Sequence, residues 1–301
     1  MPGPIESSRP VPAHGIGGRM VALTRRAALF AAPALASCGA GPRSGVSGGI
    51  PAGEMAVPRL NALSAHGTLP GEPDAALRWT AIPAGATQLR IVVHLHGFSA
   101  PNEPLRLVQG RLPGSGLVLP AFPPTIAILP RGRPLPGRPG AFDWPALATP
   151  GGLQAVVEEA LAGFGPRLPA PTQLVLTAHS GGGSGLARIL ETSLRGVLRV
   201  DEAHLFDALY GDHGPVLRWA RARAADARPG VPPPALAVIA RPGTATEAPS
   251  RRLAAGLGQA GLGAPRFRVL LTSAPHNDIP RLFGPALLAD AAAALPATSL
   301  A

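Results

Sequence analysis

Short apolar runs bounded by turn residues recur along the chain from residue 76 onward. They predict strands at 76–82, 88–96, 125–129, 173–178, 203–209, 235–240 and 266–272. Most of these runs are short and rich in Val, Ile and Leu. That pattern is typical of strands buried on both faces of a parallel sheet.

Helical patterns lie between several of these strands. They predict helices at 153–164, 184–197, 215–227, 250–261 and 285–295. Alternation of strand and helix indicates an α/β domain with a mostly parallel, doubly wound sheet flanked by helices. The first strands follow one another without a helix, so we expect an antiparallel edge near the N-terminus.

One long segment, residues 131–152, is too rich in Pro and Gly for regular structure. A loop of that length inside a compact domain often has a functional role. It either forms part of the wall of a substrate site or is a plain surface excursion, and the sequence favours neither.

Composition supports a folded domain and argues against nucleic-acid binding. The 301 residues are 46% hydrophobic, which is enough for a substantial core, and 38 Gly and 38 Pro indicate many loops. The net charge of +10 comes from Arg alone. The denser patches, which lack interleaved aromatic residues, are Arg131, Arg133 and Arg138, and Arg218, Arg221 and Arg223. They indicate a solvated basic face, and we expect no nucleic-acid partner.

The N-terminal part has the layout of a signal peptide. From Met20, a basic pair at Arg25 and Arg26 precedes a short apolar run and then small residues leading to Cys38. The run is too short for a hydrocarbon core of about 30 Å, so cleavage after export fits better than a permanent span. A start at Met20 would make residues 1–19 a leader extension or untranslated.

Two details of this segment resemble bacterial export signals. Arg25-Arg26 is similar to a twin-arginine signal, and Leu35-Ala36-Ser37-Cys38 resembles a lipoprotein lipobox. The lipobox implies cleavage before Cys38 and lipidation of its sulfur, hence anchoring at the extracytoplasmic face of the cell envelope. The alternatives are a chance match within an ordinary signal and a plain positive n-region.

These signals divide the chain into three parts. We expect a leader and signal peptide over 1–37, a flexible tether rich in Gly, Pro and Ser over 38–57, and the folded α/β domain over 58–301. Cys38 is the single cysteine, so an internal disulfide and a cysteine-built zinc site are excluded.

The strongest chemical signal follows the strand predicted at 173–178. It leads through His179 into Ser180 and three glycines, and then into a helix, which is the context of a nucleophile elbow. Ala178 and Gly182 occupy the small flanking positions of G-x-S-x-G, with Ala in place of the first Gly. The segment thus resembles the α/β-hydrolase superfamily of serine hydrolases, over roughly residues 70–297. A phosphate-binding loop is the alternative, but the segment has neither the Walker Lys nor the dinucleotide spacing.

A reactive Ser180 needs a base and an acid. His276 follows the last predicted strand, where the superfamily places its base. Asp207 ends the first strand after the elbow and is the favoured acid, although most members carry the acid one strand later. In that later loop the only carboxylate is Glu247, which is the alternative acid or a first-turn helix charge. Asp212 is interpreted as the cap of the helix near residue 215.

The resemblance also implies an oxyanion hole made by the backbone N–H groups of Gly181 and Phe98. His179 is expected to pack under the elbow. His94 and His96 lie on one strand face and could chelate a metal, but no acidic third ligand follows nearby. We therefore expect neither a metal nor a cofactor.

Together these features predict an exported, lipid-anchored serine hydrolase of the carboxylesterase kind. Its substrate would be a small-molecule or lipid-like ester, less readily an amide, cleaved through an acyl-enzyme on Ser180. Two alternatives remain open: a non-catalytic envelope lipoprotein that keeps the fold to bind a ligand or partner, and a metal-dependent hydrolase using His94 and His96.

Overall fold

The structure of the chain is a computed structural model that describes residues 48–69, 71–99 and 116–295. All of these belong to one unit, residues 41–301. The predicted signal peptide, the arginine pair and the lipidation site at Cys38 lie outside the described residues.

Eight strands form one sheet in the order β1-β2-β4-β3-β7-β8-β9-β10. They are β1 Gly53–Val57, β2 Ala75–Trp79, β3 Arg90–Leu95, β4 Thr125–Pro130, β7 Gln173–His179, β8 Glu202–Phe206, β9 Ala235–Ala240 and β10 Phe267–Leu271. The six strands from β4 to β10 in this order are parallel, whereas β1 and β2 pair antiparallel at the N-terminal side. The expected mostly parallel sheet, with an antiparallel edge near the N-terminus, is confirmed.

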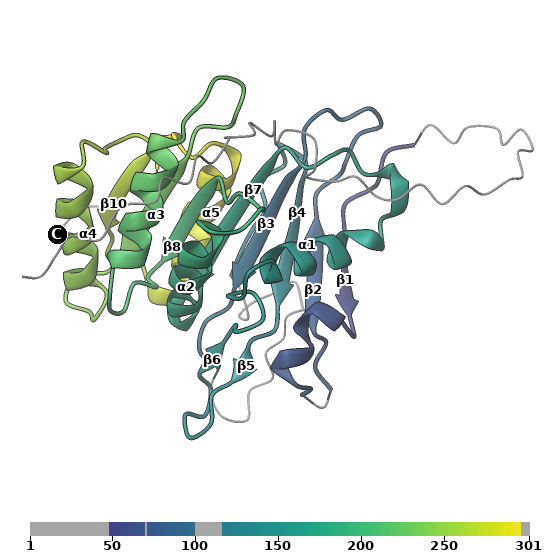
Figure 1. The fold of residues 1–301 in the computed structure, drawn as a ribbon, viewed down its shortest axis with the longest axis horizontal. Helices are drawn as coiled ribbons and strands as arrows, with labels where there is room; N and C mark the ends of the chain where they lie inside the picture. The colour runs from purple at the N-terminus through teal and green to yellow at the C-terminus, as the bar shows by residue number, and fades with distance from the viewer. Residues whose placement is uncertain (1–47, 70, 100–115, 296–301) are drawn as a thin grey trace, which may run out of the picture. The chain divides into compact units, whose positions relative to one another are not determined.

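Helices cover both faces of this sheet (Figure 1). They are α1 Gly152–Ala162, α2 Gly183–Ser193, α3 Gly214–Ala225, α4 Glu247–Gln259 and α5 Ile279–Ala289. The first four share one buried apolar cluster with Ile91 and Val93 of β3, and α5 shares the other cluster with Val92. Because successive strand residues point to opposite faces, the apolar run 91–93 of β3 buries side chains on both sides at once.

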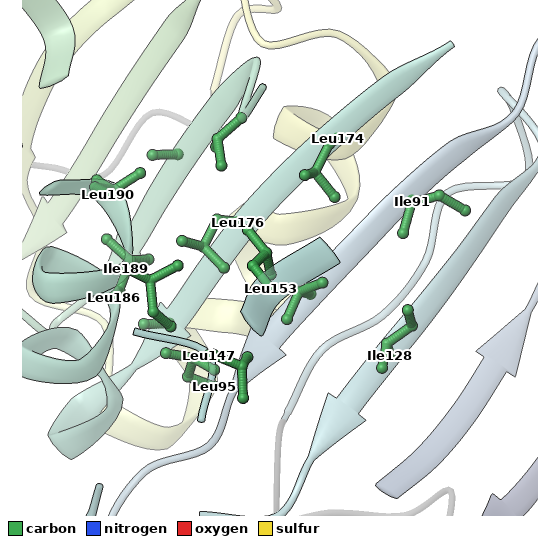
Figure 2. Packing of buried hydrophobic residues seen from close by; sticks show 14 of the residues in the cluster. Ile91, Leu95, Ile128, Leu147, Leu153, Leu174, Leu176, Leu186, Ile189 and Leu190 are labelled. Atoms are coloured by element: carbon green, nitrogen blue, oxygen red, sulfur yellow. The ribbon is translucent and has the colours of Figure 1, made fainter. Parts of the chain in front are cut away.

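The layer under α1 and α2 fixes the position of the segment after β7. Figure 2 shows Leu153 of α1 and Leu186 of α2 in the same cluster as Leu95 and Leu176 of the sheet. All four side chains are largely buried. Their packing holds the start of α2 against the ends of β3 and β7, where the predicted site residues lie.

The folded part begins earlier than the predicted boundary at residue 58. β1 pairs along its whole length with β2, and Ile50 forms a further bridge to Ile82. The Trp79 indole N–H also donates a hydrogen bond to the carbonyl of Pro51 at 2.7 Å. The prediction of a tether up to residue 57 is therefore wrong for residues 50–57. A short edge strand in a Gly-rich stretch carries almost no hydrophobic signal of its own.

Two other predicted segments differ in the structure. The last helix, predicted at 285–295, runs from Ile279 to Ala289 and contains Pro285. Pro280 suits its first turn, where no N–H is needed, so proline here marks a helix start. Residues 131–152 are not wholly irregular, because β5 Arg133–Pro134 and β6 Phe142–Asp143 form a short hairpin.

The prediction of a solvated basic face is wrong for part of the patch around Arg131. Arg131 is buried, and its guanidinium donates hydrogen bonds to Asp74 at 3.0 Å and to the carbonyl of Gly67 at 2.6 Å. Its charge is thus neutralised inside the fold and is removed from the surface.

Across the described ranges, no helix is both long enough and apolar enough to span a membrane.

Candidate active site

Ser180 stands at the junction of β7 and α2 in a strained backbone conformation. Its φ angle is +50°, in the left-handed region that residues other than glycine rarely adopt. Such an angle turns the chain sharply out of the strand and into the helix. The side chain is thereby presented at the carboxyl edge of the sheet, where ligands bind in α/β folds.

The glycines after Ser180 permit this turn because the surrounding backbone leaves no room for a Cβ. A Cβ at residue 182 would lie 2.6 Å from the Leu95 carbonyl oxygen, and one at residue 183 would lie 1.7 Å from that of Ala208. Both distances are far below van der Waals contact. The Gly-rich sequence is therefore required by the close approach of α2 to the neighbouring loops.

His276 and Asp207 are brought together at the same edge of the sheet. Asp207 directly follows β8, and His276 begins a 3₁₀ turn, His276–Asp278, a few residues after β10. His276 Nδ1 lies 2.7 Å from Asp207 Oδ2. With the proton on Nδ1 facing the carboxylate, Nε2 is left with its lone pair and can act as a base.

The Asp207 carboxylate is buried and accepts two further hydrogen bonds. Arg241 Nε lies 2.9 Å from Oδ2, and the Thr246 hydroxyl donates to Oδ1. Burial alone would raise the pKa of Asp207, but the hydrogen bonds from His276, Thr246 and Arg241 outweigh it and lower the pKa to about 2. The carboxylate is therefore ionised at any working pH.

Glu247, the alternative acid, lies in the first turn of α4 with partners of its own. Its Oε2 accepts the backbone N–H of Gly243 at 2.7 Å, and its Oε1 accepts from Arg251 Nε at 2.8 Å. The hydrogen bond from Gly243, followed by that from Arg251, lowers the pKa of Glu247. The structure brings Asp207, and not Glu247, to His276.

His179 packs beneath the elbow and supports the loop that carries His276. Its ring centroid lies 4.5 Å from that of His276, and its Nε2 donates to the His276 carbonyl at 3.1 Å. Burial is the main cause that lowers the pKa of His179 to about 4, and the neighbouring His276 adds to it. A neutral His179 therefore holds the base in place without competing for its proton. Its neighbour Ala178 is fully buried in the sheet.

The two predicted oxyanion donors lie close together. A Cβ at residue 181 would lie 3.5 Å from the backbone nitrogen of Phe98, so the backbones of Gly181 and Phe98 face each other. Gly97 is also required here, since its Cβ would lie 2.8 Å from that of Ser180. The Phe98 side chain is exposed.

His96 holds the Phe98 loop and uses both ring nitrogens to do so. Its Nδ1 donates to the Gly97 carbonyl at 2.9 Å, and its Nε2 accepts the backbone N–H of Gly132 at 3.0 Å. Burial lowers its pKa to about 4. His94 Nδ1 lies 2.7 Å from the Thr177 hydroxyl. Within the described ranges, no group of three or more His, Cys, Asp or Glu residues is placed to hold a metal.

The hairpin of residues 131–152 packs against the Phe98 loop. Ser99 N–H donates to the Gly140 carbonyl at 3.0 Å, and a Cβ at Gly140 would meet the Phe98 ring at 2.5 Å. The segment thus borders the candidate site. This agrees with the first of its two predicted roles, part of the wall of a substrate site.

Three residues at the site were not predicted from the sequence: Tyr210, Arg241 and Thr246. Tyr210 is the single tyrosine of the chain and is half-exposed. Burial raises its pKa, and a side-chain hydrogen bond with Ser180 acts in the opposite direction. A tyrosine three residues after the candidate acid was the available signal, but spacing alone does not show where its side chain points.

Comparison with known proteins shows similarity in solved structures alone. No family model matches the chain, and no curated protein matches it. The structure is similar to esterase B from Lactobacillus rhamnosis, with 16% identity over 70% of this chain and 74% of that one, at a TM-score of 0.39. It is also similar to a hormone-sensitive lipase from a metagenome library, with 17% identity, 68% and 74% coverage, and a TM-score of 0.39. A thermostable esterase gives 18% identity, 69% and 56% coverage, and a TM-score of 0.43. At these identities the activity of the chain has to be inferred from its own site.

Proposed function

We propose that this protein is a serine hydrolase that cleaves carboxylic esters through an acyl-enzyme on Ser180. The observation that carries the proposal is the 2.7 Å contact between His276 Nδ1 and Asp207, beside a serine held at a φ of +50°. Ser180, His276 and Asp207 follow three different parallel strands of one sheet, and this position supports the roles of nucleophile, base and orienting acid. That combination defines a reaction class more narrowly than the fold does.

The chemistry follows from the geometry. His276 Nε2 removes the proton of the Ser180 hydroxyl as Oγ forms a bond to the ester carbonyl carbon. The backbone N–H groups of Gly181 and Phe98 stabilise the negative oxygen of the tetrahedral intermediate. The protonated ring, stabilised by Asp207, then gives its proton to the departing alcohol as the C–O bond breaks. A water molecule, deprotonated by His276, releases the acid and regenerates Ser180.

The proposed location is the extracytoplasmic face of the cell envelope, with the protein anchored through lipidated Cys38. The basic pair Arg25-Arg26, the short apolar run after it and the lipobox-like residues before Cys38 support this part of the proposal. Mass spectrometry of the full-length protein from its membrane fraction tests it. A diacylated cysteine at the mature N-terminus is expected, and a Cys38→Ala variant should lose its membrane association.

Labelling with a small fluorophosphonate tests the catalytic part. Folded wild-type protein should be labelled on Ser180, and Ser180→Ala should not be labelled. Ser64→Ala, which changes an exposed serine in a separate 3₁₀ turn, is the matched control and should be labelled like wild type. A folded wild-type protein whose Ser180 resists the probe would instead fit a ligand-binding lipoprotein that lacks catalysis.

A further inference from the structure

A pocket of about 260 Å³ lies beside the elbow, between the start of α2 and the segment that joins β8 to α3. From α2 it is lined by Gly183, Ser184, Ala187 and Arg188. From the other side it is lined by residues 208–212 and Pro215. None of the steps described for Ser180, His276 and Asp207 uses this pocket.

Two contacts connect the pocket to the nucleophile. Gly183 lies so near Ala208 that the start of α2 and the segment after Asp207 touch directly beside Ser180. Tyr210 lines the pocket, and its side chain lies near enough to Ser180 to interact with it. The pocket is therefore adjacent to the nucleophile.

Resting on the serine hydrolase function proposed above, we propose that this pocket binds the acyl group of the ester. The reacting carbon carries three substituents besides Ser180 Oγ. The carbonyl oxygen is directed to the N–H groups of Gly181 and Phe98, and the alcohol oxygen to the proton on His276. The pocket is lined by neither the Phe98 loop nor the His276 loop. The remaining substituent, the acyl chain, is the one that it receives.

The chemistry of the lining selects a neutral apolar acyl group. Ala187, Ala208, Leu209 and Pro215 supply apolar surface. The charged groups at the pocket are already paired within the protein. Arg188 is bound to Asp143, and a carboxylate oxygen of Asp212 accepts the backbone N–H of Gly214 at 2.8 Å. A charged acyl group would have to displace one of these partners or lose its hydration without compensation.

The volume of the pocket sets the length of the chain. An apolar cavity of about 150 Å³ holds one benzene ring, so a pocket of about 260 Å³ has room for about ten carbon atoms. Each methylene buried in the pocket favours binding by about fourfold, and methylenes that extend beyond the pocket contribute little. We therefore expect kcat/KM to rise with acyl length and to level off at roughly eight to ten carbons.

The experiment is a p-nitrophenyl ester series from acetate to palmitate with wild type and Ser184→Phe. Ser184 is exposed on the first turn of α2 and lines the pocket, so a phenyl ring there fills the space from the solvent side. The ratio of kcat/KM for octanoate to that for acetate should fall by about tenfold. Ala155→Phe, which adds the same ring at an exposed position of α1, is the matched control and should leave the ratio unchanged.

A second series keeps the acetyl group and lengthens the alcohol from ethyl to octyl. Ser184→Phe should leave the dependence on alcohol length as in wild type. If this variant changes the alcohol series and not the acyl series, the acyl assignment is overturned, and the same holds if it changes neither. Fluorophosphonate labelling of every variant separates the two proposals. Unlabelled wild type defeats the serine hydrolase function, whereas intact labelling with an unchanged acyl profile defeats the pocket assignment alone.

Discussion

Arg241 Nε lies 2.9 Å from Asp207 Oδ2, the same oxygen that accepts the hydrogen bond from His276 Nδ1. Arg241 directly follows β9, one strand beyond the strand that supplies Asp207. That is the location in which most α/β-hydrolases would carry the acid itself. Here a cation in that place binds the carboxylate that comes from the preceding strand, so the charge of Asp207 is shared between a guanidinium and an imidazole.

Arg241→Gln should lower kcat, because the Asp207 carboxylate loses one of the hydrogen bonds that hold it beside His276. The Arg241 side chain is 35% exposed, so water can replace part of this contact, and a loss of about tenfold is expected. The measurement is kcat for one ester under saturating conditions.

Arg251→Gln is the control for this change, because Arg251 is exposed and pairs with Glu247 instead of Asp207. Its kcat should match that of wild type. A loss of equal size in both variants would indicate a general effect of removing positive charge and would remove the specific role of Arg241.

Replacing the two candidate acids should have very different effects. Asp207→Asn removes the acceptor that holds the proton on His276 Nδ1, and kcat is expected to fall by up to about 10⁴. Glu247→Gln disturbs a helix start and should change kcat less than about threefold. Steady-state kinetics with p-nitrophenyl acetate measures both. A large loss in Glu247→Gln alone would transfer the acid role to Glu247.

Most strands of the sheet could be predicted from the sequence, because a strand buried on both faces needs apolar residues at most of its positions. β4 and β9 are largely apolar and buried at every position, and the structure places them within about one residue of the prediction. β1 was missed because an edge strand needs few apolar residues. The start of α5 was missed because the predicted helix began at Pro285, whereas the helix begins before Pro280, a proline in its first turn.

The same contrast applies to the site. The position of Ser180, His276 and Asp207 at one edge of the sheet follows from chain order and from the direction of parallel strands, so the sequence could predict it. The contacts of Arg241, Thr246 and Tyr210 depend on how individual loops turn after their strands. A φ of +47° at Asp207 aims its carboxylate, and no pattern of residue types specifies that angle.

Two buried histidines should make the protein less stable in mild acid. Burial lowers the pKa values of His96 and His179 to about 4 in the folded protein, compared with 6.5 for an exposed ring. Between these values the unfolded chain binds more protons than the folded one, so stability is present above about pH 6.5 and is lost as the pH falls toward 4. Each ring accounts for about 2 kcal/mol between pH 7 and pH 5. Urea unfolding at the two pH values measures the sum.

His179→Gln separates one ring from the other, since it keeps a side-chain N–H for the His276 carbonyl but does not titrate. The loss of unfolding free energy between pH 7 and pH 5 should be smaller in this variant than in wild type by about 2 kcal/mol. An unchanged loss would mean that His179 is not held neutral by the fold.

Gly183→Ala should disrupt the elbow, whereas Gly258→Ala should stabilise the protein. At residue 183 a Cβ would lie 1.7 Å from the Ala208 carbonyl oxygen, which belongs to the backbone beside Asp207. The backbone has to move, and since Ser180 and Asp207 flank this contact, we expect loss of fluorophosphonate labelling together with a destabilisation of about 1 to 3 kcal/mol. Gly258 lies inside α4 with nothing within 4 Å of its Cβ position, so alanine there should add about 0.5 to 1 kcal/mol. Thermal unfolding and fluorophosphonate labelling of both variants measure the change in stability and the state of Ser180. A Gly183→Ala protein with wild-type labelling would show that the close approach of α2 is not needed to present Ser180.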